Sequence, residues 1–253
     1  MKVDEALLDR LAEFDTPTIC NTIELFEIQP RTTGYAGAAI KACFPKMSPA
    51  VGFAATASFR ASSPGRTGTA YTGIEEQLAA FEALPGRPFV VIQDLDHPVK
   101  AAVFGEVMCS SYQAFGAAGL MTNGAGRDLL QVESLGFPVF TGGTLCSHGY
   151  CHLLHLGMPV TLDGLVVNEG ELLHADANGI AMIPFGLEEP IATLAGKFVV
   201  AEEIILEYVK SESPKSIDEY RDRRAAFQLR INGLKAEALE MLDAVQGDGS
   251  QPG

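Results

Sequence analysis

The fold of this chain is decided by residues 89–140, which read FVVIQDLDHPVKAAVFGEVMCSSYQAFGAAGLMTNGAGRDLLQVESLGFPVF. Short apolar runs alternate here with stretches whose apolar residues recur at helical spacing, in the order 89–92, 105–117, 119–122, 127–135 and 137–140. A continuous apolar run is typical of a buried strand, and strand–helix–strand alternation predicts parallel strands joined by crossover helices. The stretch therefore predicts an α/β fold built on a parallel sheet.

The flanking segments extend this pattern and then depart from it. Residues 51–59 predict a further strand, and residues 73–84 predict a helix that stops at Pro85-Gly86. Downstream, short β runs separated by Gly or Asn-Gly turns predict a smaller β layer or barrel, at 160–162, 165–167, 172–174 and 180–183. Two long amphipathic patterns, at 187–209 and 217–245, predict C-terminal helices that contribute to subunit contacts.

Composition and charge exclude several classes of protein. The chain has 253 residues, 47% hydrophobic and 20% charged, with a net charge of -14. It is too apolar for a disordered chain, and its acidity argues against a nucleic-acid partner, which needs a basic surface. No run of 18 apolar residues predicts a membrane span, and residues 1–5 do not resemble a signal peptide. The five cysteines are an odd number without a repeated spacing, which favours reduced thiols and a cytoplasmic protein.

Residues 123–128, Asn-Gly-Ala-Gly-Arg-Asp, are the first candidate site, because they lie between a predicted strand and a predicted helix. Ligands collect at the carboxyl ends of parallel strands, and glycines let the backbone approach a ligand closely. Arg127 offers a planar fork for a carboxylate or phosphate, and Asp128 offers a hard oxygen ligand for Mg²⁺ or Mn²⁺. The dinucleotide-binding fingerprint is excluded, since Leu129 stands where its third glycine belongs. The alternative is an Asp–Arg pair that only caps a helix.

Residues 105–108, Gly-Glu-Val-Met, open the preceding predicted helix and form the second candidate. Their backbone N–H groups are expected at the same sheet edge as Arg127 and Asp128. Glu106 is then a candidate second carboxylate near a metal ion, with the N–H groups left for substrate oxygens. The alternative is an ordinary acidic residue in the first turn of a helix.

A third candidate is the segment 146–155, which contains two cysteines and three histidines. If it is helical, His148, His152 and His155 lie on one face, an arrangement that suits zinc. Gly149 weakens such a helix, and no standard zinc spacing is present. The alternative is that the segment lines a subunit interface or the mouth of a pocket.

The pair Gly105-Glu106, twenty further residues and the pair Arg127-Asp128 together resemble the signature of the RraA-like and 4-hydroxy-4-methyl-2-oxoglutarate aldolase family. Further similar stretches lie at 135–140, 159–160 and 170–184, and the resemblance covers residues 10–205. It implies a swivelling α/β/β fold with a mixed parallel sheet, a smaller β layer and C-terminal helices. We expect one RraA-like domain over residues 1–211, with N-terminal helices, followed by a helical extension over residues 212–253 that has no clear counterpart in the family. The family assembles as homotrimers or homohexamers with active sites between subunits.

The resemblance further implies a set of site residues. Asp128 matches the metal ligand and Arg127 the substrate-binding arginine. Glu106 matches an acidic position that the aldolases fill with Asp and the non-catalytic regulators fill with Gly. Glu203, or Glu202 beside it, matches an acidic residue supplied to the metal site by a neighbouring subunit. The loop that holds the substrate carboxylate is formed by the backbone of Gly105, Glu106, Val107 and Met108.

The function implied by this resemblance is that of a divalent-metal-dependent lyase, using Mg²⁺ or Mn²⁺, that cleaves a small 2-oxo acid by retro-aldol reaction. Pyruvate is released, and oxaloacetate decarboxylation accompanies this activity in the family. Arg127 is expected to stabilise the enolate, and a water polarised by Glu106 to take the hydroxyl proton, with His148 and His152 as other candidate bases. Two alternatives stay open: a non-catalytic regulator that binds a protein partner, and a related metal-dependent decarboxylase or dehydratase of sugar-derived acids.

Overall fold

The computed structural model of the chain describes residues 2–65 and 71–248. The chain divides into two compact units, one of residues 1–16 and 32–183 and one of residues 17–31 and 184–253. The predicted division into a domain over residues 1–211 and an extension over residues 212–253 remains a prediction. The last five residues of that extension, 249–253, lie outside the described residues.

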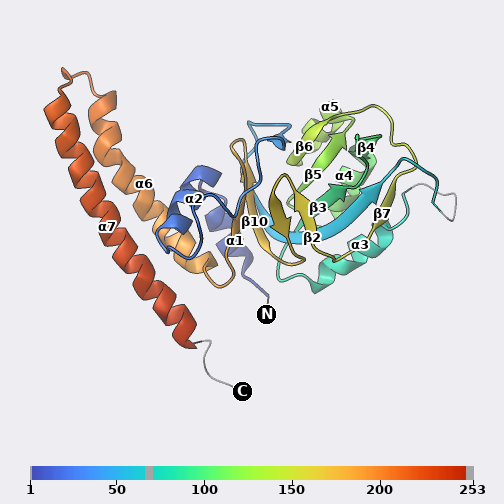
Figure 1. Cartoon of the computed structure of the whole chain (residues 1–253), viewed down its shortest axis with the longest axis horizontal. Helices are drawn as coiled ribbons and strands as arrows, with labels where there is room; N and C mark the ends of the chain where they lie inside the picture. Colours follow the sequence, from blue (N-terminus) through green and yellow to red (C-terminus); the bar gives the residue numbers. More distant parts are fainter. Residues whose placement is uncertain (1, 66–70, 249–253) are drawn as a thin grey trace. The chain divides into compact units, whose positions relative to one another are not determined.

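A mixed sheet forms the body of the first unit (Figure 1). Among the described residues its strands are β1 Lys41–Ala42, β2 Ala50–Arg60, β3 Pro88–Asp94, β4 Ala102–Phe104, β5 Gly119–Gly126, β6 Val139–Thr144, β7 His152–Leu154, β10 Leu172–Asp176 and β11 Gly179–Ile183. Their order is β1-β6-β5-β3-β2-β10-β11, with β4 beside β5 and β7 beside β2. Strands β2, β3, β5 and β6 run parallel to one another. This confirms the parallel arrangement predicted from residues 89–140.

A smaller β layer covers part of this sheet. It is the antiparallel pair of β8 Val160–Leu162 and β9 Leu165–Val167. Buried side chains of the pair, such as Leu162 and Val167, belong to one apolar cluster with Phe89, Val91 and Met121 of the main sheet. The smaller layer was expected to include residues 172–183 as well, but β10 and β11 instead join the main sheet, where β10 pairs antiparallel with β2.

The helices of the first unit are α1 Glu5–Leu11, α3 Ile74–Ala80, the 3₁₀ turn η1 Phe81–Ala83, α4 Glu106–Ala114 and α5 Leu129–Leu135. Gln77 ties α3 to both neighbours, because its Nε2 donates to the Ala55 carbonyl at 3.2 Å while its Oε1 accepts from the Tyr112 hydroxyl of α4 at 2.7 Å. A buried polar side chain is thereby fully paired. Helices, mixed sheet and the β8–β9 layer form the α/β/β architecture predicted from the sequence.

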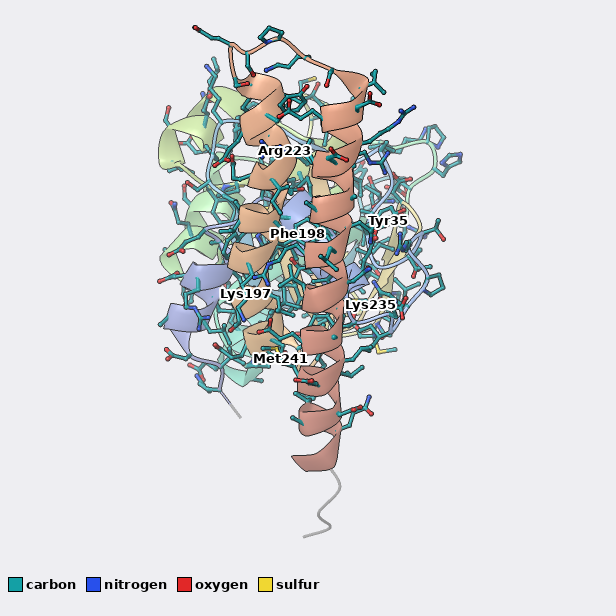
Figure 2. The ribbon with its side chains drawn as sticks, turned by 90° about the vertical axis from the view of Figure 1, so that its left-hand side faces the viewer. Tyr35, Lys197, Phe198, Arg223, Lys235 and Met241 are labelled. Carbon is teal, nitrogen blue, oxygen red and sulfur yellow. The ribbon has the colours of Figure 1, made fainter. Side chains whose placement is uncertain are left out.

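The second unit is helical, with α2 Thr16–Glu24, α6 Glu188–Lys210 and α7 Ile217–Asp248. Helices α6 and α7 pack side by side, and Phe198 lies where they meet, edge-on to Phe227 (Figure 2). Lys197 forms an ion pair with Glu237 across the same contact. Both helices were predicted, to within a few residues at each end.

Two further expectations concern the whole chain. All five cysteines are free thiols, as the sequence predicted. Within residues 2–65 and 71–248, no helix combines the length and the apolar character that crossing a bilayer requires.

Candidate active site

The ends of three parallel strands meet at one edge of the main sheet. Strand β4 runs into Gly105, β5 ends at Gly126, and β6 ends at Thr144. Strands β4 and β6 both pair with β5, which brings their carboxyl ends together. The Arg127 N–H donates to the Phe104 carbonyl at 3.0 Å, and the Leu145 N–H donates to the Gly126 carbonyl at 3.1 Å. The two candidate segments predicted from the sequence therefore lie side by side.

Close packing explains the glycine at the end of β5. A Cβ atom at Gly126 would overlap the Phe104 ring, so only glycine fits. The chain then turns sharply at Asp128, which takes the left-handed conformation with φ 55° and ψ 36° before α5 begins. Aspartate tolerates this conformation better than most residues. The turn places the Asp128 carboxylate over the start of α4.

The Asp128 carboxylate contacts both neighbouring groups through one oxygen. Its Oδ2 accepts the Glu106 N–H at 3.1 Å and lies 3.6 Å from the Arg127 Nε. Its Oδ1 makes no hydrogen bond or ion pair with any described residue. Both side chains are partly exposed, Arg127 at 27% and Asp128 at 38%. A pocket of about 410 Å³ opens beside them, lined by Gly126, Arg127, Asp128, Leu129, Thr144, Leu145 and Cys146.

The other predicted residues differ in their surroundings. Glu106 is exposed at the start of α4, Val107 is 77% exposed, and Met108 is buried. Gly105 precedes the helix, where its carbonyl accepts the Cys109 N–H at 3.0 Å. Glu203 lies on α6 in the second unit and is half-buried. The structure thus brings Gly105, Glu106, Arg127 and Asp128 together.

Replacing Gly105 by alanine is expected to disrupt this cluster without unfolding the protein. The added Cβ would lie 2.5 Å from Asp128 Oδ2 and 3.0 Å from Arg127 Nε, while the Gly105 backbone at φ -152° suits any residue. The Asp128 and Arg127 side chains must move to relieve this overlap. A misplacement of about 1 Å in such groups is expected to lower catalytic turnover about a hundredfold. Gly143→Ala is the matched control, because a Cβ at Gly143 meets nothing within 4 Å. Thermal melts should leave both variants near wild type, and full activity in Gly105→Ala would contradict the placement of the site.

The predicted histidine face does not exist, because residues 146–151 form no helix and residues 152–154 form strand β7. The helical condition on which a zinc site depended is therefore not met. His152 is buried with its Nε2 2.8 Å from the Ser63 carbonyl, whereas His155 is exposed and has a positive φ of 48°. Gly149, with a φ of 52°, is one cause of the break. The alternative expectation for this segment is supported at one residue, since Cys146 lines the pocket.

Tyr71 is a site residue that the sequence did not predict. Its hydroxyl accepts a hydrogen bond from the Arg127 Nη2 at 3.1 Å, across 56 positions of sequence. Its ring lies 5.3 Å from the ring of the half-buried His148. Burial raises the pKa of the neighbouring Cys151 thiol to about 11, although a hydrogen bond with the Tyr71 backbone and the charge of Arg127 act in the opposite direction. The thiol is therefore protonated at neutral pH, which argues against a cysteine nucleophile here.

Asp94 is a second residue without a signal in the sequence. It ends β3 and is 5% exposed. Its Oδ1 accepts the Asp96 N–H at 2.9 Å, while its buried Oδ2 makes no hydrogen bond with a described residue. Burial is the largest cause that raises the pKa of this carboxyl, to about 6. Gly124 gives it room, because a Cβ there would lie 2.8 Å from the Asp94 Oδ2.

The raised pKa of Asp94 predicts a pH-dependent stability. The folded state binds this proton more tightly than the unfolded state, whose Asp pKa is near 4, so the free energy of unfolding falls as the pH rises from about 4 to about 6. The contribution is up to about 3 kcal/mol. Asp94→Asn is expected to flatten this dependence in denaturant titrations at pH 4.5 and pH 7, and Asp222→Asn, an exposed control, is expected to keep it. If the free energy of unfolding of Asp94→Asn depends on pH as strongly as that of the wild type, the Asp94 carboxyl is ionised in the folded protein.

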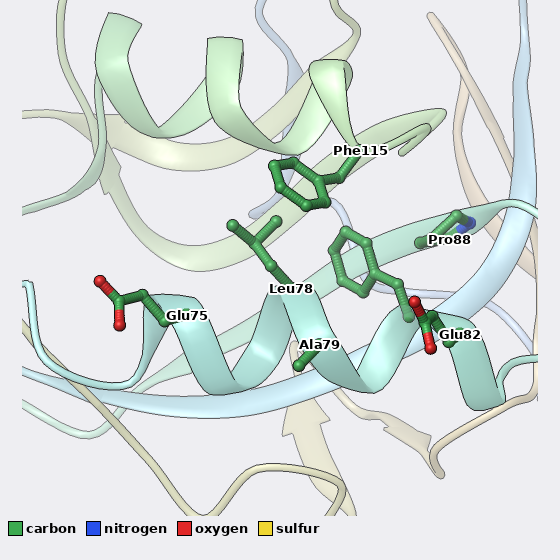
Figure 3. Close-up of a pocket in the computed structure, with 7 residues that line it drawn as sticks. Glu75, Leu78, Ala79, Glu82, Pro88 and Phe115 are labelled. Carbon is green, nitrogen blue, oxygen red and sulfur yellow. The ribbon is translucent and has the colours of Figure 1, made fainter.

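A larger pocket of about 600 Å³ lies elsewhere in the first unit, between α3 and the end of α4 (Figure 3). It is lined mainly by apolar side chains, among them Leu78, Phe81 and Phe115. Figure 3 shows Glu75 and Glu82 at opposite ends of the helical stretch that lines it. None of the predicted site residues lines it, so the smaller pocket beside Arg127 is the better candidate active site.

The chain is similar in sequence to one described protein family and to two named relatives. The model of the family described as RraA-like, Aldolase/RraA, matches residues 16–182. A protein of Halalkalibacterium halodurans and one of Ectopseudomonas mendocina, both named "Putative 4-hydroxy-4-methyl-2-oxoglutarate aldolase", are each 30% identical to this chain, over 120 and 111 residues. These matches cover 47% and 42% of this chain, and 56% and 67% of the relatives. The chain thus spans only about half the length of the Halalkalibacterium relative.

Solved structures resemble the fold. A protein of Pseudomonas syringae has a TM-score of 0.68 at 19% identity, covering 89% of this chain and 95% of that one. Streptomyces coelicolor RraAS2, described as an unusual member of the RNase ES inhibitor RraA protein family, has a TM-score of 0.63 at 23% identity, covering 80% and 96%. At such identities the likeness concerns the arrangement of helices and strands.

Proposed function

Because the chain belongs to the RraA-like family, we propose that it is a cytoplasmic, divalent-metal-dependent lyase that cleaves a small 2-oxo acid by retro-aldol reaction and releases pyruvate. Decarboxylation of oxaloacetate is part of the same proposal, since it also leaves a pyruvate enolate. The observation that carries the proposal is the convergence of Arg127, Asp128 and the Gly105-Glu106 turn at one sheet edge, beside an open pocket. The names of the two aldolase relatives support the same reaction class.

The donor set fits a magnesium-type ion. Within the described residues there is no group of three or more His, Cys, Asp or Glu side chains placed to hold a metal. Mg²⁺ does not need one, because one or two carboxylates with water and substrate oxygens satisfy it, and Mn²⁺ accepts the same oxygen donors. Asp128 would bind through its Oδ1, and Glu106 would act through a water. Glu203 of a neighbouring subunit, in a homotrimer or homohexamer, is the candidate for a further carboxylate.

The chain's own groups would bind the 2-oxo acid at both of its polar ends. The N–H groups at the start of α4, those of Val107 and Met108, point along the helix axis and suit a carboxylate oxygen. Arg127 offers its guanidinium beside them, since its Nε lies 3.6 Å from the same Asp128 Oδ2 that accepts the Glu106 N–H. A bound divalent cation supplies Lewis-acid polarisation of the keto oxygen.

Bond cleavage would then move charge toward Arg127. As the carbon–carbon bond breaks, its electron pair becomes the pyruvate enolate, and the guanidinium stabilises the negative charge on the enolate oxygen. The departing hydroxyl loses its proton to a water polarised by the exposed Glu106. The proton taken up by that water is then delivered to the enolate carbon, which completes pyruvate, and the second product leaves as a carbonyl compound. Each step uses groups that line or adjoin the pocket.

Two alternative functions make different experimental predictions. A non-catalytic regulator would bind a basic partner through its surface, a reading favoured only by the net charge of -14. A related decarboxylase or dehydratase would use the same metal on a sugar-derived acid. Calorimetry with Mn²⁺ distinguishes the enzyme from the regulator, because the enzyme should bind the ion and should lose that binding in Asp128→Asn. A panel of 2-oxo and sugar acids with Mg²⁺, assayed for pyruvate, separates the lyases. Absence of metal binding would overturn the proposal.

A further inference from the structure

The Arg127 guanidinium is held by two protein groups on neighbouring nitrogens. Its Nε lies 3.6 Å from the Asp128 Oδ2, and its Nη2 donates to the Tyr71 hydroxyl at 3.1 Å. The third nitrogen, Nη1, makes no hydrogen bond or ion pair with a described residue. We propose that Tyr71 is a positioning residue, which holds the guanidinium so that Nη1 faces a bound carboxylate. This inference rests on the proposed function only in taking Arg127 as the substrate-binding group.

The backbone of Tyr71 indicates that its place is imposed by the fold. Its φ of 64° lies in the left-handed region, which a bulky aromatic residue rarely adopts. Such a conformation persists only where surrounding contacts determine it, and these are often found at ligand sites. Here the Tyr71 N–H donates to the Cys151 carbonyl at 2.8 Å, and Thr72 forms a β-bridge with His152. The strained turn therefore fixes the direction in which the tyrosine side chain leaves the main chain.

The tyrosine ring is supported as well as its backbone. The His148 ring lies 5.3 Å away at an interplanar angle of 41°, and it covers one side of the tyrosine. Contacts of this kind restrict the two side-chain torsions of a tyrosine. The hydroxyl oxygen is consequently a fixed acceptor, and it keeps its own proton for a further acceptor such as a substrate oxygen.

A fixed acceptor matters because the arginine has a competing partner. The guanidinium is within ion-pair distance of Asp128, and the Arg127 side chain is only 27% exposed. Without Tyr71, the arginine could turn to form a two-nitrogen contact with that carboxylate, which arginine and carboxylate geometry favours. Such a contact would occupy both the substrate-binding group and the metal ligand. Tyr71 thus keeps Arg127 and Asp128 available for separate tasks.

The test is binding of oxalate, a two-carboxylate mimic of the pyruvate enolate, measured by calorimetry at constant MgCl₂. Tyr71→Phe is expected to raise the Kd about tenfold, the cost of one hydrogen bond to a charged group. Tyr150→Phe is the matched control, because Tyr150 is half exposed and its hydroxyl makes no hydrogen bond with a described residue; it should bind like wild type. Equal melting temperatures check that all variants fold.

A double-mutant cycle separates positioning from a general effect on structure. In the Arg127→Ala background, Tyr71→Phe is expected to change the Kd for oxalate less than twofold, because the group that it positions is gone. An equal loss in both backgrounds, or a wild-type Kd in Tyr71→Phe, would overturn the inference. If Tyr71→Phe binds oxalate tenfold more weakly but the wild-type protein cleaves no 2-oxo acid, the positioning role of Tyr71 is supported and the proposed reaction is rejected. No binding of oxalate to the wild-type protein would reject both.

Discussion

Asp128→Asn is expected to lower pyruvate release at least about a thousandfold, the loss that follows when several kcal/mol of metal-ion stabilisation are removed. The substitution keeps the shape of the side chain and an oxygen for the Glu106 N–H, so the turn between β5 and α5 should persist. What it removes is the negative charge on the oxygen assigned to the cation. Pyruvate can be followed continuously through NADH consumption by lactate dehydrogenase, with oxaloacetate or 4-hydroxy-4-methyl-2-oxoglutarate as substrate.

Two comparison variants make this result specific. Asp222→Asn removes the same charge from an exposed position on α7 and should leave turnover unchanged. Glu106→Gln should lose about tenfold to a hundredfold, because Glu106 is proposed to act through a water rather than on the ion directly. Turnover in Asp128→Asn within a factor of ten of wild type would reject Asp128 as the metal ligand.

Arg127→Lys is the second large effect, although it conserves the charge. We expect kcat/KM to fall about a hundredfold to a thousandfold, as on removal of a donor from an oxyanion site. A lysine ammonium cannot donate to Tyr71 and to a carboxylate from fixed, coplanar nitrogens, whereas the guanidinium contacts Tyr71 and Asp128 through two of its three. Part of the loss should appear in kcat, because the charge on the enolate oxygen develops only as the bond breaks.

The matched control for the arginine is Arg60→Lys. Arg60 is half exposed and lies 3.6 Å from the Asp96 carboxylate, so it is also an ion-paired arginine of the first unit. Its replacement should leave kcat/KM unchanged. Mn²⁺ binding should remain intact in Arg127→Lys, since the arginine is not a metal ligand. A kcat/KM near wild type in Arg127→Lys would contradict the assigned role.

Residues 89–140 predict the parallel part of the fold well, because apolar runs that alternate with helical spacing leave few alternatives. Strands β4 and β7 were missed, since these three-residue strands lack the Asp-Gly turn that marks the equally short β8 and β9 in the sequence. The pairing of β10 with β2 was also missed, because two short strands beside Gly turns indicate a hairpin but not which edge it joins. Partner choice depends on contacts between segments far apart in the sequence.

The candidate site shows the same limit. Helices that follow parallel strands begin at one sheet edge, so the nearness of Gly105-Glu106 and Arg127-Asp128 could be inferred from their places at the starts of successive predicted helices. The place of Tyr71 in the site could not be inferred, because this residue lies in a turn with no regular pattern. Its contact with Arg127 depends on tertiary packing alone. The shared face of the three histidines required a helix, and the positive φ at Gly149, Cys151 and His155 breaks that helix.

The central claim is that a divalent cation at Asp128 is required for cleavage of a 2-oxo acid. The most direct measurement is the rate of pyruvate release by one wild-type preparation in three states: as purified with Mg²⁺, after EDTA treatment and removal, and after Mg²⁺ or Mn²⁺ is returned. We predict release in the first state, loss in the second and recovery in the third. Pyruvate release that survives EDTA, or that is absent in all three states, would contradict the claim.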